Sequence, residues 1–254
     1  MITVHFNQVF VEQDIALGNH LFQYCICRIV AMKNGYNFFI PYSGKLKECF
    51  PNLDLGVSDG IIKYGCPDLR EGEEFNPHIY NVRDFTHLNG NYQGVKYYED
   101  HEDLVKEWLK IEMDDEVQKV IDKYPVDEYC YIHLRGNSNK GSWFMTPKSF
   151  YEKGIAEMTK MKEDVKFVII TDDVELSKEF FPDIDVISGH YEGVMTDFKS
   201  LYFAKYSIIS NSTFSWWPRW LSDGITFAPN HWLNYNKGGE FCPKGMETKK
   251  FIYI

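Results

Sequence analysis

Residues 206–221 read YSIISNSTFSWWPRWL. An apolar run, Ser207–Ile209, gives way to four small polar residues, Ser210–Thr213, and then to Phe214, Ser215 and the first tryptophans. This order predicts a buried strand, a polar turn and a helix start. In an open α/β sheet such a place suits anionic ligands, because the first N–H groups of the helix and its dipole point there. The alternative is a well-capped core helix, since Ser, Thr and Asn are ordinary cap residues.

Pro218 refines the expected start of this helix. Proline has no N–H and its ring clashes with the carbonyl four residues back, so a helix that starts at Asn211 would break there. With Ser215 as N-cap, Pro218 falls in the first turn, where no donor is needed. We therefore expect residues 211–214 to form a loop that faces a ligand.

The composition predicts a soluble globular protein with an ordinary hydrophobic content of 44% and a net charge of −10. This charge argues against a nucleic-acid partner but leaves room for a nucleotide-sized anion. Aromatic residues make up 17% of the chain, and although they suit sugars and nucleobases, core packing explains most of them. The sequence leaves the oligomeric state open.

The six cysteines include no C-x-x-C pair, which favours reduced thiols in the cytoplasm over a zinc site or a disulfide framework. No apolar segment approaches the ~20 residues that span a bilayer, and the N-terminal sequence does not resemble a signal peptide. We expect a soluble, cytoplasmic protein, with peripheral contact to a membrane left open.

The first part of the chain starts as a strand, loop, helix and strand. Residues 1–6 and 36–42 have strand-like patterns, and the helix between them, at 20–35, has apolar spacing near 3.6 and Gly35 as its stop. Residues 43–94 are irregular. Two acidic amphipathic helices follow, at 100–111 and 114–124.

After Pro125 the pattern becomes regular. Five strand-like runs alternate with helical ones, the strands being expected at 128–135, 165–171, 185–188, 207–210 and 225–229. This alternation predicts an α/β fold with a doubly wound parallel sheet. We expect a looser N-terminal α/β domain at residues 1–124 and a nucleotide-binding-type domain at 125–254.

Candidate ligand-binding residues lie where two of these strands end. His133 and Arg135 are two apart in a strand, so both side chains should point the same way, and arginine suits bidentate phosphate binding. The alternative for Arg135 is a salt bridge to a nearby acid. Asp172 and Asp173 end the next strand, where a carboxylate can bind ribose hydroxyls, although for one of the pair capping of the following helix is the better explanation.

A D-x-D pair, Asp183 and Asp185, would suggest a metal-dependent sugar transferase. The pair precedes the strand at 185–188, at the edge opposite the ligand end, so we interpret it as a capping turn. The chain also lacks G-x-S-x-G, a Walker loop and H-E-x-x-H, so the hydrolase and ATPase templates fail.

Ordered motifs along nearly the whole chain resemble the alpha-1,2-fucosyltransferase family (glycosyltransferase family 11). These motifs are GNHLFQY at 18–24, HLR at 133–135, TDD at 171–173 and NSTFSWW at 211–217, with Pro229 and Trp232 beyond. NSTFSWW is the most specific of them. The chain departs from the family where Gly136-Asn137 replace a second arginine and an acid, where His20 replaces Gln, and at Pro218-Arg219.

The resemblance implies a GT-B-like fold with two Rossmann-like domains, GDP-fucose as donor, a glycan acceptor, inversion at the anomeric carbon, and no required metal or other cofactor. It implies that Arg135 holds the donor diphosphate with residues 211–213 beside it. On the same resemblance, we expect residues 1–124 to form the acceptor-side domain, in which residues 43–94 would set the acceptor, and residues 125–254 to form the nucleotide-sugar-binding domain. The donor-side candidates are His133, Arg135, Asp172, Asp173, Asn211, Ser212, Thr213 and Ser215, and the cleft-lining candidates are Gly18, Asn19 and Gln23.

The general base has two candidates, His20 and Asp14, because an imidazole or a carboxylate can accept the proton of an acceptor hydroxyl. Because of the departures from the family pattern, three alternatives stay open. They are a transferase for another nucleotide deoxysugar such as rhamnose, a non-catalytic binder of nucleotide sugars or glycans, and a metal-dependent transferase that uses Asp183 and Asp185.

Overall fold

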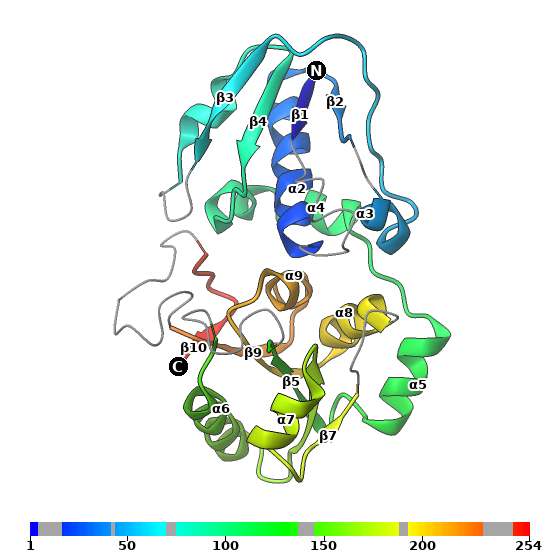
Figure 1. The fold of residues 1–254 in the computed structure, drawn as a ribbon, viewed down its shortest axis with the longest axis vertical. Helices are drawn as coiled ribbons and strands as arrows, with labels where there is room; N and C mark the ends of the chain where they lie inside the picture. Colours follow the sequence, from blue (N-terminus) through cyan, green and yellow to red (C-terminus); the bar gives the residue numbers. More distant parts are fainter. Residues whose placement is uncertain (5–16, 42–43, 70–74, 137–144, 188–192, 231–245) are drawn as a thin grey trace. The chain divides into compact units, whose positions relative to one another are not determined.

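A computed structural model describes residues 1–4, 17–41, 44–69, 75–136, 145–187, 193–230 and 246–254. The chain divides into two compact units, of which the first runs from Met1 to Lys110 and the second begins at Ile111 (Figure 1). Residues 111–124 therefore pack with the second unit, and the domain limits 1–124 and 125–254 stay a prediction.

The first unit is built on a parallel four-stranded sheet in the order β2-β1-β4-β3. Its strands are β1 (Ile2–Val4), β2 (Phe38–Phe39), β3 (Tyr64–Leu69) and β4 (Thr86–Gly90). Its helices are α2 (Leu17–Asn34), α3 (Gly44–Cys49), α4 (Glu102–Trp108) and the short 3-10 helices η1 (Pro77–Asn81), η2 (Val95–Tyr97) and η3 (Glu99–His101). The predicted opening unit of strand, helix and strand is confirmed, and the helix begins three residues before His20.

The long helix α2 ends where the sequence predicts. Gly35 has a φ of 66°, a left-handed conformation that favours glycine, and the N–H of Tyr36 donates to the carbonyl of Ala31 at 2.9 Å. The helix is buried along most of its length, and the Cys27 thiol donates to the carbonyl of Ile2 on β1. Burial of this helix against the sheet forms the core of the first unit.

Two strands, β3 and β4, lie in the segment 43–94 that has no clear periodicity in the sequence. They read YGCPDL and THLNG, and the Gly, Pro and Asn in them are uncommon inside strands. Their register places Tyr64 beside Thr86 and Cys66 beside Leu88. Pairing with a neighbouring strand, rather than local propensity, thus determines this part of the sheet.

The second unit has a parallel six-stranded sheet in the order β10-β9-β8-β5-β6-β7. Its strands are β5 (Tyr129–Leu134), β6 (Lys166–Thr171), β7 (Asp185–Val186), β8 (Tyr206–Ile209), β9 (Ile225–Ala228) and β10 (Ile252–Tyr253). Its helices are α5 (Asp115–Lys123), α6 (Lys148–Met161), α7 (Val174–Phe180), α8 (Val194–Phe203) and α9 (Thr213–Leu221). The five predicted strands are confirmed, and β10 is an addition at the edge.

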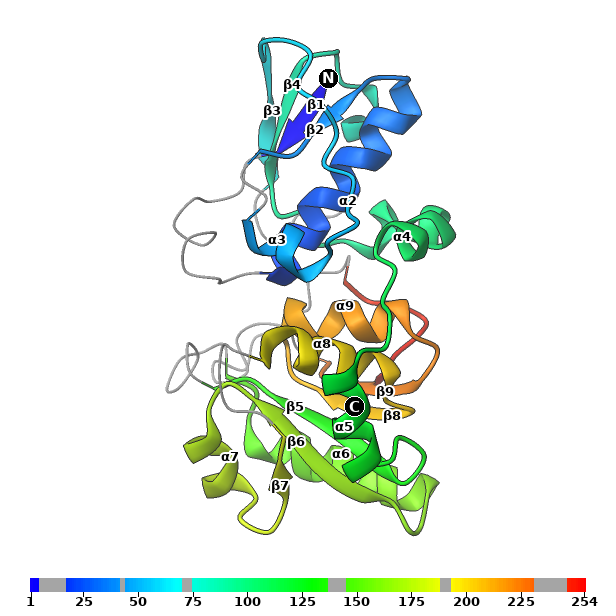
Figure 2. The ribbon, with the colours of Figure 1, turned by 90° about the vertical axis from the view of Figure 1, so that its right-hand side faces the viewer.

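The chain winds outward from β5 in both directions, to β6 and β7 on one side and to β8 and β9 on the other. One apolar cluster joins the sheet to α6 and α7 through Phe150, Met158 and Leu176. Another joins it to α8 and the end of α5 through Leu201 and Tyr124. Both faces of the sheet are therefore covered, as Figure 2 shows, which confirms the doubly wound fold.

The predicted start of α9 is wrong. The helix begins at Thr213 with Ser212 as N-cap, and the N–H of Trp216 donates to the Ser212 carbonyl at 3.0 Å. Pro218 therefore lies inside the helix rather than in its first turn. Tertiary burial overrides the cost of proline, because Trp216, Trp217 and Trp220 are each at most 1% exposed in the core.

Candidate donor site

The carboxyl ends of three neighbouring strands meet at one edge of the second sheet. His133 near the end of β5 pairs in register with Ile209 on β8, and Leu134 pairs with Thr171 on β6. The N–H of Ser210 continues the ladder by donating to the His133 carbonyl at 3.1 Å. The sequence motifs at 133–135, 171–173 and 211–213 are thus brought together by the sheet.

Arg135 follows the end of β5 and is partly exposed at this edge. Its Nη1 lies 2.7 Å from Oδ2 of Asp172, so the salt bridge considered from the sequence is present. The other oxygen of Asp172, Oδ1, accepts a 2.7 Å hydrogen bond from the N–H of Gly136. These two contacts fix the guanidinium and the carboxylate side by side, where each can present polar atoms to a ligand.

Gly136 lets the backbone pass close to the acidic pair. A Cβ at this position would come within 2.4 Å of the Asp173 Cβ. Asp173 itself caps α7, since its Oδ1 accepts a 2.9 Å hydrogen bond from the N–H of Leu176. The capping explanation is therefore correct for Asp173, while Asp172 faces Arg135.

His133 is buried, whereas Arg135 is partly exposed, and the expectation that both side chains point the same way stays a prediction. The strand β5 ends at Leu134, so Arg135 lies beyond the alternating part of the chain. The His133 side chain is 3% exposed, with Nδ1 2.8 Å from Ser210 Oγ and its ring beside Phe214. Burial, reinforced by the positive charge of Arg135, lowers the pKa of His133 to about 3, so its imidazole is neutral at pH 7.

The start of α9 lies beside these residues. Ser212, its N-cap, makes no side-chain hydrogen bond to the first turn. Asn211 is held from the other side, because Thr146 Oγ1 donates to Asn211 Oδ1 at 2.6 Å and accepts from the Asn211 N–H at 3.3 Å. The first-turn N–H groups of α9 are thus not capped by Ser212, and the loop before them is fixed in place.

Ser215 is fully buried, with Oγ donating to the Ser212 carbonyl at 3.2 Å, whereas Ser212 and Thr213 are partly exposed. Ser215 therefore reinforces the first turn of α9. Ser212, Thr213 and Phe214 are the partly exposed residues of the motif.

The four features at this edge are an arginine, a carboxylate, a helix N-terminus without a side-chain cap and a rigid polar loop. Together they can bind an anion that also carries hydroxyl groups. Residues 87–246, more than half of the chain, match the sequence profile of Glycosyl transferase family 11. The chain belongs to this family.

Relatives agree with this assignment to family 11. The chain is 23% identical over 275 residues to the alpha-1,2-colitosyltransferase of Escherichia coli, which covers 89% of this chain and 93% of that protein. It is also 30% identical over 97 residues to the O-antigen biosynthesis glycosyltransferase WbnK of Escherichia coli, covering 35% of this chain and 32% of that protein. The protein is thus a glycosyltransferase, similar to the alpha-1,2-fucosyltransferases, as its motifs predict.

A solved structure supports the fold of this family 11 enzyme. The family 9 glycosyltransferase of Veillonella parvula superimposes with a TM-score of 0.55 at 12% identity, over 100% of this chain and 86% of that one. The similarity concerns the fold alone, and it confirms the predicted GT-B class with two parallel α/β units.

The residues expected to line a cleft lie on α2, and two of them form hydrogen bonds with residues at or just after the end of β4. Gln23 Nε2 donates to the Gly90 carbonyl at 3.0 Å, and Asn19 Oδ1 accepts from Gln93 Nε2 at 2.8 Å. Gly18 is buried in the first turn of α2, and Asn19 beside it is partly exposed. These contacts hold the start of α2 against the carboxyl edge of the first sheet.

His20 is 5% exposed, and burial lowers its pKa to about 4. The imidazole is therefore neutral at pH 7, but it is a weaker base than an ordinary histidine. Asp14, the other candidate base, lies outside the described residues. The role of general base stays a prediction for both.

Two further observations bear on metal and membrane binding. Among the described residues, no group of three or more His, Cys, Asp and Glu side chains could hold a metal ion. Asp183 and Asp185 lie at the amino end of β7, where Asp185 Oδ2 accepts a 3.2 Å hydrogen bond from the Tyr124 hydroxyl. In the described ranges, no helix has the length and apolarity needed to cross a bilayer.

Sequence reasoning missed Thr146, Gly136 and Ser210. Thr146 is 2% exposed and 65 residues from its partner Asn211, so only the fold reveals the pair. The signal available for Thr146 was its place directly before Pro147 at the start of α6. Thr146, like the predicted residues, precedes a helix at the ligand edge of the sheet.

Proposed function

We propose that this family 11 enzyme is an inverting, metal-independent transferase that moves a deoxyhexose, L-fucose in the first instance, from its GDP sugar to a hydroxyl of a glycan. The observation that carries the proposal is the Arg135–Asp172 pair beside the start of α9, at the carboxyl edge of a doubly wound sheet. Such edges bind the diphosphates and riboses of nucleotides in other α/β folds.

The proposed reaction is a single displacement, in which the acceptor oxygen attacks the anomeric carbon as the nucleoside diphosphate departs. Negative charge grows on the diphosphate in the transition state, so groups that stabilise it there accelerate the reaction. Arg135 and the first N–H groups of α9 would supply that stabilisation in place of a metal. A bound diphosphate would compete with Asp172 for the guanidinium of Arg135. The Asp172 carboxylate would then accept a hydrogen bond from a ribose hydroxyl.

The relatives as well as the motifs support the choice of donor sugars to test. The similarity to an alpha-1,2-colitosyltransferase over 89% of this chain supports colitose as an alternative to fucose, since both are deoxyhexoses. The departure at Pro218-Arg219 does not bear on this choice directly, because both side chains are buried. We propose fucose first and keep colitose and rhamnose as the sugars to test beside it.

Substitution of Arg135 tests the proposal. We expect Arg135→Ala to lower the transfer rate by about 100- to 1000-fold, because it removes a cation aimed at the leaving group. The matched control is Lys148→Ala, which removes an exposed cation at the start of α6 in the same unit and should leave the rate unchanged. The measurement is GDP release with each donor, alongside circular dichroism; retention of most activity by Arg135→Ala would exclude this role.

Three further readouts separate the alternatives. Full activity in EDTA supports metal independence, while its loss would point to a metal-dependent transferase. The coupling constant of the product's anomeric proton tests inversion. Binding of the donor without GDP release, across many acceptors, would mean a non-catalytic binding protein.

A further inference from the structure

A hollow of about 370 Å³ lies in the first unit, lined by residues that the candidate donor site does not use, and more of its surface is apolar than polar. It is lined by β3, by η1 and by the segment that joins η1 to β4. The polar and aromatic side chains around it come from Tyr64, Asn76, His78, Asn81, Arg83 and Thr86. We refer to this hollow as the β3–η1 pocket.

The β3–η1 pocket lies at the amino edge of the first sheet. Tyr64 and Thr86 are the first residues of β3 and β4 and pair with each other in register. The end of α2 lies at the same edge, since Asn34 Nδ2 donates to the Tyr80 carbonyl in η1 at 3.0 Å. The start of α2, with Asn19 and the other cleft candidates, is at the opposite, carboxyl edge, so the pocket is a separate feature of this unit.

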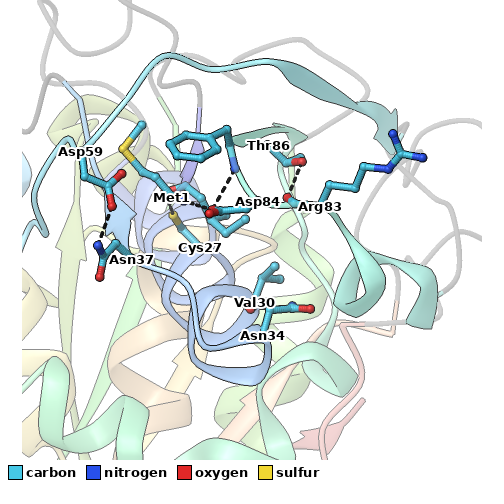
Figure 3. Close-up of polar contacts among 11 residues, drawn as sticks. Met1, Cys27, Val30, Asn34, Asn37, Asp59, Arg83, Asp84 and Thr86 are labelled. Carbon is cyan, nitrogen blue, oxygen red and sulfur yellow. Dashed lines mark hydrogen bonds and ion pairs between the residues drawn. The ribbon is translucent and has the colours of Figure 1, made fainter.

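A rigid turn places Tyr64 and Arg83 next to each other. Phe85 has a φ of 61°, and its carbonyl accepts from the N–H groups of Lys63 and Tyr64 at 2.9 and 3.2 Å. Thr86 Oγ1 donates to the Arg83 carbonyl at 2.7 Å, and Figure 3 shows the Arg83 side chain extending away from this turn. The Arg83 guanidinium carbon lies 5.3 Å from the centre of the Tyr64 ring, which is 43% exposed as a residue.

Arg83 differs from the other arginines that the structure describes. Arg28 faces Asp54 and stacks on Trp108, Arg135 pairs with Asp172, and Arg219 is buried among carbonyl oxygens. The Arg83 side chain makes no hydrogen bond and no ion pair within the described ranges, and its one contact of this kind there is with the Tyr64 ring. In a chain of net charge −10, an arginine at the rim of a pocket without an acid partner is a candidate for binding a ligand anion.

The other lining groups suit a sugar ring. Asn76 uses its Oδ1 to accept from the N–H of His78, which fixes the orientation of its amide. Asn81 adds a second amide at the other end of η1. Amides bind hydroxyl groups, and an exposed tyrosine ring covers the apolar face of a pyranose.

We infer that the β3–η1 pocket binds an acidic sugar, a hexuronate unit of a glycan, with its carboxylate on Arg83, its hydroxyls on Asn76 and Asn81, and its ring against Tyr64. The site is separate from the donor site. It rests on the proposed function only in taking the ligand to be a glycan, and its chemistry can be tested without any transfer reaction.

The test compares methyl glucuronide with methyl glucoside, which differ in the carboxylate, and uses acetate as the anion alone. Binding to the whole protein is measured by NMR titration. A second readout is alkylation of Cys66, which lines the pocket and is only partly buried, followed by peptide mass spectrometry. We expect about tenfold tighter binding of the glucuronide than of the glucoside, and protection of Cys66 by the glucuronide.

Two variants locate the interaction. Arg83→Gln should remove the preference for the glucuronide, because it keeps polar contact but loses the charge, and Tyr64→Ala should weaken both sugars. The control Arg135→Ala should leave glucuronide binding unchanged, and the circular dichroism spectrum and thermal unfolding of Arg83→Gln should match those of the parent protein, which checks that the variant is folded. Any of three results would overturn the inference: equal affinity for both glycosides, an affinity for acetate equal to that for the glucuronide, or an unchanged preference in Arg83→Gln. Failure of the parent protein to bind GDP would overturn only the proposed function.

Discussion

At the scale of single residues, His133 and Arg135 at the end of β5 differ in burial and in charge. His133 is enclosed beneath Phe214 and neutral, while Arg135, two residues on, is partly exposed and paired with Asp172. The histidine supports the loop at Ser210, and the arginine faces the ligand edge. Two residues of one short motif thus lie in different environments, and we propose ligand binding for the arginine.

The buried histidines predict how stability depends on pH. The folded-state pKa values of His133 and His20 are lowered to about 3 and 4, while an unfolded histidine titrates near 6.5. Below about pH 6.5 the unfolded chain therefore binds protons that the folded chain does not. The free energy of unfolding should fall as the pH is lowered toward 4, by about 1.4 kcal/mol per pH unit for each histidine, and this stability is fully present above pH 6.5.

Urea unfolding at pH 7, 6 and 5 measures this dependence. His133→Asn should reduce the loss between pH 6 and 5 by about 1 kcal/mol, because one proton uptake is removed. His78→Asn changes an exposed histidine in η1 and should keep the slope of the parent protein. An identical slope for His133→Asn and the parent would refute the linkage.

At the scale of elements, a buried arginine connects α9 to its neighbours through hydrogen bonds. Arg219 is 0% exposed; its Nη1 donates to the carbonyls of Leu201 and Ala204 at the end of α8, and its Nε donates to Thr226 Oγ1 on β9. Burial lowers the pKa of Arg219 to about 10, which still leaves it charged at pH 7. One side chain therefore ties α9 to a neighbouring helix and a strand, and offsets part of the cost of Pro218.

Removal of this link should destabilise the second unit. We expect Arg219→Met to lower the free energy of unfolding by about 3 kcal/mol, because it leaves buried carbonyl oxygens without donors. Gly224→Ala should also destabilise, since its Cβ would come within 2.2 Å of Arg219 Nη2. Lys205→Met, an exposed change in the same region, should stay within about 0.5 kcal/mol of the parent, and chemical denaturation compares all three.

At the scale of the whole molecule, the candidate donor residues all belong to one of the two compact units. They come from the ends of β5, β6 and β8 and the start of α9, which are far apart in the sequence and adjacent in the sheet. A donor nucleotide should therefore stabilise these segments first. Its effect on the β3–η1 pocket in the first unit should be smaller.

Hydrogen exchange with and without GDP tests this distribution. At a hundredfold excess over its Kd, GDP should raise the free energy of unfolding by about 2.7 kcal/mol. Protection should concentrate in peptides that cover 133–136, 171–173 and 211–215. Protection mainly at 64–86 instead would contradict the assignment of the donor site to the second unit.

The sequence alone predicted the parts of the fold in which local pattern and tertiary structure agree. The alternation after Pro125 identified five strands of the second sheet, and Gly35 marked the end of α2. The predictions failed where tertiary contacts dominate, as in β3 and β4, whose Gly, Pro and Asn residues give no strand signal, and in α9, whose proline suggested a later start.

For the candidate donor site, the sequence by itself determined the family and identified the motifs for which we propose the chemistry, because residue types and their order are local information. Only the tertiary structure decided that Arg135 pairs with Asp172, that His133 is buried, and that Thr146 holds Asn211. Burial and pairing depend on residues that the sheet brings together from distant positions, such as the 65 residues that separate Thr146 from Asn211. No local pattern in a single sequence contains that information.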